Sequence, residues 1–106
     1  MTVVWADDAR ANVRRLFAPM ARERPLQARR WIARLESAAA RLEVFPWSGH
    51  SVPEVPRLAM REMLVAPYRL IYFVGDEQVT IINVCHTRES LAEYPEAAAV
   101  AVDDGY

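Results

Sequence analysis

The residues of this chain whose type could do chemistry are mainly arginines. All 13 basic residues are arginine, and none is lysine. A guanidinium group binds a carboxylate or a phosphate through two parallel hydrogen bonds, so arginine suits the binding of an acidic peptide or a nucleic-acid backbone. Arg61 and Arg69 stand out because each interrupts an apolar, strand-like segment. A GC-rich coding sequence would also explain the composition, so the arginine content alone does not select a function.

Other patterns of catalytic residues are absent from the sequence. His50, Cys85 and His86 lack the spacing of metal ligands, and we expect neither a metal nor another cofactor. There is no glycine-rich phosphate loop, serine-centred triad or paired-carboxylate site. Since Cys85 is the only cysteine, no internal disulfide can form, which favours a reducing compartment and a cytoplasmic location. We expect Cys85 to be a small buried apolar residue.

Length and composition predict one soluble domain. The chain has 106 residues, of which 53% are hydrophobic and 25% are charged, so apolar surface is sufficient for a single core. No apolar run approaches the roughly 20 residues that span a bilayer. Residues 1–74 carry 12 arginines and 7 acids, whereas residues 75–106 carry 1 arginine and 7 acids. The resulting net charge of −1 argues against a general nucleic-acid binder.

The first half of the chain has the pattern of a short strand and two helices. Residues 3–5 are β-branched or aromatic and predict the strand. Apolar residues then recur every three or four positions from residue 9 to 20, with a kink or early stop expected at Pro19. A second amphipathic helix should begin at Pro25 and end near residue 44. Residues 47–51 are expected to form a loop.

The second half changes to a strand-like pattern. Three segments, residues 58–65, 68–74 and 79–85, are joined by short links that favour an antiparallel meander. The middle segment carries apolar side chains on both faces, so the helix hairpin must cover one of them. We therefore expect an α+β fold, with a single domain over residues 1–96. A short helix near Leu91 and a frayed tail over residues 97–106 complete the prediction.

The chain to about residue 94 resembles the RelE/ParE superfamily of bacterial type II toxin–antitoxin toxins. Four segments carry the resemblance, and their order and spacing are more specific than any one of them. They are Phe45-Pro46 with Gly49-His50, Met60-Arg61-Glu62-Met63-Leu64, Tyr68-Arg69-Leu70-Ile71-Tyr72, and His86-Thr87-Arg88. The family fold has helices packed on one face of an antiparallel sheet, as the residue patterns also predict.

The resemblance implies two alternative mechanisms. RelE-type toxins cut messenger RNA on the ribosome without a metal, and Arg69, Arg88 and Tyr94 match their functional positions, with His86 close by in sequence. Such cleavage needs a proton acceptor for the 2′-hydroxyl group and cations for the phosphorane charge. However, the two lysines that those enzymes carry on the preceding strand are Met60 and Glu62 here.

ParE-type toxins instead inhibit DNA gyrase by protein contact and need no ribonuclease site. The Arg61-Glu62 pair and the modest net charge favour this branch, and thus a protein that is not an enzyme. An inactive relative that retains only antitoxin binding is a third possibility. Either toxin would form a hetero-oligomer with a cognate antitoxin, whose C-terminal segment lays a helix on the helix hairpin and an extended stretch on the sheet.

Five residues are the predicted partner contacts, and they are Arg30, Arg34, Trp47, Arg61 and Arg69. We expect Arg61 and Arg69 to flank one open, cationic concavity on the sheet. A structural alternative exists for Arg69, which could instead pair with Glu62 or another carboxylate across the sheet. His86, at a strand end, is more simply a hydrogen-bonded structural residue than a catalytic one.

Overall fold

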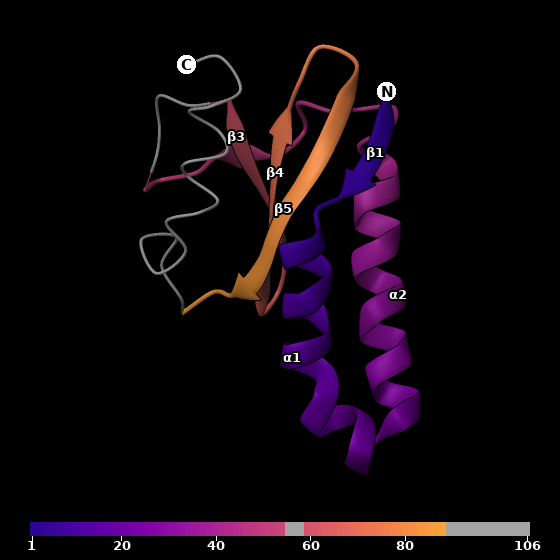
Figure 1. Ribbon diagram of the computed structural model, residues 1–106. Helices are drawn as coiled ribbons and strands as arrows, with labels where there is room; N and C mark the ends of the chain where they lie inside the picture. Colours follow the sequence, from indigo (N-terminus) through magenta and orange to yellow (C-terminus); the bar gives the residue numbers. More distant parts are fainter. Residues whose placement is uncertain (55–58, 89–106) are drawn as a thin grey trace.

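The computed structural model describes residues 1–54 and 59–88, which form two helices beside a five-stranded sheet (Figure 1). In chain order the elements are β1 (Thr2–Trp5), α1 (Asp7–Glu23), α2 (Pro25–Arg41), β2 (His50–Ser51), β3 (Met60–Val65), β4 (Tyr68–Val74) and β5 (Gln78–His86). The predicted helix near Leu91, residue Tyr94 and the tail at 97–106 lie outside the described residues. The α+β class and the order of strand, helix hairpin and meander are confirmed.

The strand order in the sheet is β1-β5-β4-β3-β2. Strands β3, β4 and β5 form the predicted antiparallel meander, and β1 lies parallel to β5 at one edge. The expectation that residues 47–51 are entirely loop was wrong, because His50 and Ser51 pair with β3 at the other edge. Two residues are too few to show the alternating pattern of a strand, so this pairing had no signal in the sequence.

Helix α2 begins at Pro25 as predicted, but both helices end at residues other than those predicted. Helix α1 continues through Pro19 to Glu23, so the early stop was wrong. Phe17 is buried and Met20 packs against the same core, so apolar contacts on both sides of Pro19 offset its missing backbone hydrogen bond. Helix α2 ends at Arg41, and the backbone N–H groups of Val44 and Phe45 then donate to the Arg41 carbonyl in a closing turn.

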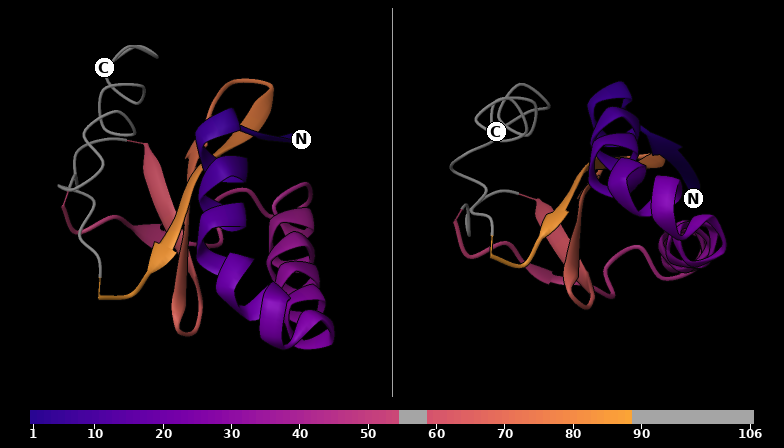
Figure 2. Two further views of the ribbon diagram at one scale, coloured as in Figure 1. Left: turned by 60° about the horizontal axis from the view of Figure 1, so that its bottom comes forward. Right: turned by 90° about the horizontal axis from the view of Figure 1, so that it is seen from below.

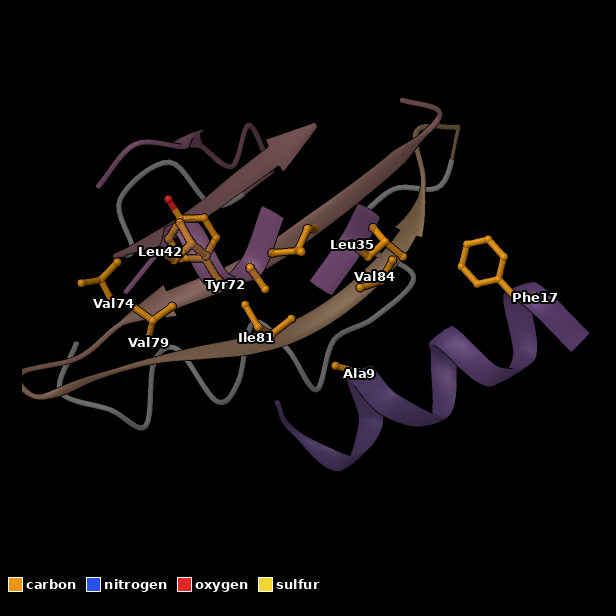
Figure 3. Packing of buried hydrophobic residues seen from close by; sticks show 11 residues of the cluster. Ala9, Phe17, Leu35, Leu42, Tyr72, Val74, Val79, Ile81 and Val84 are labelled. Atoms are coloured by element: carbon orange, nitrogen blue, oxygen red, sulfur yellow. The ribbon is translucent and has the colours of Figure 1, made fainter. Parts of the chain in front are cut away.

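The main core lies between the helix hairpin and one face of the sheet, and two further views show both helices on this side (Figure 2). Tyr72, Ile81 and Val84 of the sheet gather opposite Phe17 of α1 and Leu35 of α2 (Figure 3). All five side chains are 2% exposed or less. The prediction that the hairpin covers one face of the middle strand is therefore confirmed.

The opposite face of the sheet holds a second, smaller apolar cluster. Its buried members are Val52, Met60, Ile71, Phe73, Ile82 and Cys85. Ile71 and Phe73 alternate along β4 with the residues that face the helices, as the sequence pattern required. Cys85 is fully buried, which matches its predicted role as a small apolar residue.

The buried hydroxyl group of Tyr72 fixes the segment that leads from α2 into the sheet. It accepts a hydrogen bond of 2.8 Å from the backbone N–H of Gly49. A Cβ atom at Gly49 would lie only 2.5 Å from the Glu62 carbonyl oxygen and 2.6 Å from this hydroxyl oxygen. Only glycine allows so close an approach without a shift of the backbone.

We predict that Tyr72→Phe lowers the free energy of unfolding by about 1–2 kcal/mol, because the buried Gly49 N–H loses its acceptor. The pKa of Tyr72 is raised, and burial of its hydroxyl group is the largest cause. The neutral hydroxyl group therefore stabilises the fold fully below the unfolded pKa of about 10, and this contribution is lost as the pH rises through the folded pKa.

Urea denaturation between pH 8 and pH 11 measures both effects. The variant should lose less stability than the unmodified protein over the alkaline half of this range. Burial also raises the pKa of Tyr68, so Tyr68→Phe is the matched comparison. Identical pH profiles for the unmodified protein and Tyr72→Phe would contradict the assignment.

Candidate functional site

Arg61 and Arg69 lie on opposite faces of the sheet, so they do not flank a common concavity as the sequence suggested. Arg61 is paired across the strands with Tyr72, which faces the helices. Arg69 is paired with Leu64, at the alternate position, and therefore points to the other face. Tyr72, the partner of Arg61, and Arg69 are three positions apart on β4. Because side chains alternate along a strand, an odd separation places the two arginines on opposite faces.

Arg69 is held in a buried ion-pair network. Its Nε donates to Glu62 Oε2 at 2.7 Å, and its two terminal nitrogens donate to the Glu54 carboxylate at 2.9 and 2.8 Å. Its side chain is only 8% exposed. The hydrogen bond with Glu54, more than that with Glu62, raises the pKa of Arg69 against the opposing effect of burial. The predicted pairing with Glu62 is confirmed; Glu54 lies in a turn with no sequence signal that could have named it as the second partner.

Of the residues named for RNA cleavage that the structure describes, His86 lies on the other face of the sheet from Arg69. His86 is paired with Tyr68 across the strands, and the centres of their rings lie 5.9 Å apart. Both residues lie on the face of the sheet that the helices cover, whereas Arg69 lies on the opposite face. The Nδ1 atom of His86 accepts a hydrogen bond of 3.2 Å from the backbone N–H of Arg88, which supports the structural interpretation of this histidine. The structure thus brings His86, on the other face of the sheet from Arg69, together with the backbone of Arg88.

Arg61 has a different environment from Arg69. Its guanidinium carbon lies 5.0 Å from the centre of the Trp47 ring, a cation–π geometry. One terminal nitrogen donates to the Gly49 carbonyl oxygen at 3.2 Å. Arg61 is half-buried, whereas Trp47 is 53% exposed. The structure therefore places these two predicted contacts side by side at the surface.

Arg30 and Arg34, the remaining predicted contacts, border a groove between α2 and β3. We call it the α2–β3 groove; it has a volume of about 690 Å³ and is lined by Arg30, Ala33, Arg34, Ser37, Ala38, Arg41, Leu64 and Val65. Leu64 is 57% exposed, and Arg34 lies 4.8 Å from the ring centre of Trp31. The groove combines an apolar floor with three arginines, so it suits an acidic amphipathic segment. Arg41 and Leu64 were missed by sequence reasoning because their proximity depends on how α2 packs on β3.

Metal and membrane sites can be assessed for the part of the chain that the structure describes. Within residues 1–54 and 59–88, no three His, Cys, Asp or Glu side chains come together as metal ligands would. Neither described helix combines the length and the apolar character needed to cross a bilayer.

We predict that Arg69→Ala lowers the free energy of unfolding by about 3 kcal/mol, because Glu62 would stay buried without its cation. Arg61→Ala is the matched control: Arg61 has no carboxylate partner in the described part of the chain, and the loss should stay near 1 kcal/mol. Urea denaturation of both variants measures the difference. Equal losses in the two variants would show that the buried network is not what holds Arg69.

Comparison with known proteins places this architecture in a family. Residues 3–91 match the family described as the ParE toxin of the type II toxin–antitoxin system parDE. A search of curated proteins returned no match.

Among solved structures, the fold is similar to a chain of the chromosomal ParDE toxin–antitoxin system from P. aeruginosa. The TM-score is 0.68 at 18% sequence identity, over 81% of this chain and 95% of that one. At this identity the likeness concerns the fold, whereas the family match rests on sequence and spans most of the chain. The chain therefore belongs to the ParE toxin family of type II toxin–antitoxin systems.

Proposed function

We propose that this ParE-family chain acts in the cytoplasm as a growth-arresting toxin that inhibits DNA gyrase by protein contact. A cognate antitoxin would neutralise it in a hetero-oligomer. Membership of the ParE family supports a toxin role and an antitoxin partner. The choice of gyrase over messenger RNA depends on the residues of this chain.

The buried network around Arg69 is the structural observation that carries the choice of gyrase over RNA. Two carboxylates occupy the guanidinium group, so a phosphate would have to displace Glu54 or Glu62 to reach it. Glu62 itself stands where ribonuclease relatives are expected to carry a lysine, and it adds negative charge where RNA chemistry needs cations. The arrangement supports inhibition by surface contact over phosphate chemistry.

The α2–β3 groove suits the antitoxin. Strand β3 pairs with β2 only at Arg61 and Glu62, so within the described residues its edge from Met63 to Val65 has no neighbouring strand. An extended acidic segment could add to this edge, with apolar side chains on Leu64 and carboxylates on the arginines of α2. Charge pairing and apolar burial would then act together.

The target is tested with the purified toxin in two parallel assays. We expect inhibition of gyrase supercoiling with accumulation of cleaved DNA, and no codon-dependent transcript cuts in a translation reaction. The antitoxin, added in equimolar amount, should restore supercoiling. Transcript cuts without any effect on gyrase would overturn the proposal in favour of the RelE-type mechanism.

The antitoxin site is tested by reversing charge in the groove. The double variant Arg30→Glu/Arg34→Glu should weaken antitoxin binding by at least tenfold, because two carboxylates of the partner would lose their counter-charges. Arg29→Glu is the matched control, since Arg29 is exposed on the same helix but does not line the groove. Isothermal titration at two salt concentrations measures the affinities. An equal loss for the control would indicate a general charge effect and contradict the site.

A further inference from the structure

The turn between α2 and β2 exposes large apolar side chains to an unusual degree. Val44 is 70% exposed, Phe45 is 64% exposed and Trp47 is 53% exposed. These three side chains and Arg61, which stacks on Trp47, are called the aromatic patch below. Most large apolar residues in the described part of the chain are at least half-buried, so the patch concentrates apolar surface that the core does not use.

The backbone of this turn is fixed at several points. The N–H of Phe45 donates to the Arg41 carbonyl at 3.0 Å, and the N–H of Ser48 donates to the Phe45 carbonyl at 3.2 Å. Gly49 is buried and bonds both the Tyr72 hydroxyl group and the Arg61 guanidinium group. The following residues pair with β3. The apolar side chains are therefore presented on a preorganised backbone, which lowers the entropy cost of binding a partner.

Arg61 gives the aromatic patch an electrostatic preference. Within the described residues, Arg61 contacts one backbone carbonyl and the Trp47 ring, and it forms no ion pair with a carboxylate. Several of its five N–H donors thus remain for a partner, in contrast to the fully engaged Arg69. Tryptophan and arginine are also the residue types most enriched among the contacts that dominate protein–protein affinity.

We infer that the aromatic patch is the surface through which the toxin binds its protein target, and that the target presents an apolar pocket bordered by a carboxylate. The inference rests on the proposed function, in which the target is a protein. None of the four patch residues lines the α2–β3 groove, so target and antitoxin would use separate surfaces. An aromatic ring with an arginine could also stack on single-stranded RNA bases. Val44, the neighbouring exposed Glu43 and the net charge of −1 favour a protein.

Binding of purified gyrase to the full-length toxin and to its variants tests this assignment. Trp47→Ala should weaken binding about 30-fold, as expected for a central contact, with Phe45→Ala and Arg61→Ala each weakening it about tenfold. Trp47→Phe and Arg61→Lys should recover part of the affinity. Leu26→Ala is the matched control, because Leu26 is 60% exposed at the far end of α2 and should leave binding within twofold. Antitoxin binding should be unchanged in the Trp47 and Phe45 variants, and the urea midpoint should be unchanged in Phe45→Ala and fall by no more in Trp47→Ala than in Arg61→Ala, because the two lose the same stacking contact.

The possible results separate the patch from the proposed function. If the unmodified toxin binds gyrase and the patch variants bind equally well, the patch assignment is overturned and the function stands. If the unmodified toxin does not bind gyrase, the proposed function and the assignment that depends on it both fall. Equal losses of antitoxin and gyrase binding would overturn the separation of the two surfaces. Patch-dependent binding of a single-stranded RNA oligonucleotide, without gyrase binding, would assign the patch to RNA instead.

Discussion

The alternation of side chains along β4 is the constraint on which the rest of this structure depends. Strand β4 is central, with β5 on one side and β3 on the other, so both of its faces must be covered. Tyr68, Leu70 and Tyr72 point to the helix hairpin, while Ile71 and Phe73 point to the second cluster. Because successive residues of a strand alternate, every residue paired with β4 is assigned to one face or the other.

This constraint gives two arginines of neighbouring strands different roles. Arg69 falls on the face opposite the helix hairpin, where burial among apolar side chains requires charge compensation, and Glu54 and Glu62 supply it. Arg61 falls on the helix side but near the end of the sheet, where it reaches Trp47 and remains accessible. The same side-chain chemistry therefore stabilises the fold at one position and is available to a partner at the other.

The proposed interaction surfaces also follow from how the hairpin sits on the sheet. Helix α2 contacts β3, so its outward arginines and the part of β3 that lacks a neighbouring strand among the described residues line the α2–β3 groove. Where α2 ends, the chain must turn sharply to reach β2, and the hydrogen bonds that fix this turn leave Phe45 and Trp47 facing solvent. The two proposed contact surfaces thus lie at different places on one small core.

The periodicity of apolar residues predicted both helices and the three long strands, because each is long enough for its pattern to be seen above chance. It also predicted that the hairpin covers one face of β4, and cross-strand pairing offered Glu62 or another carboxylate as the alternative partner of Arg69. It missed the continuation of α1 past Pro19 and the short β2, since packing of Met20 and pairing with β3 are not local properties.

Residue types and their spacing along the chain by themselves determined the α+β class, the helix hairpin and the likeness to this toxin family. Only the tertiary structure decided which arginine is buried, which carboxylate in a turn reaches it, and which aromatic side chains stay in solvent. The physical reason is that local patterns fix the period of an element, whereas strand register and helix packing fix what each side chain meets.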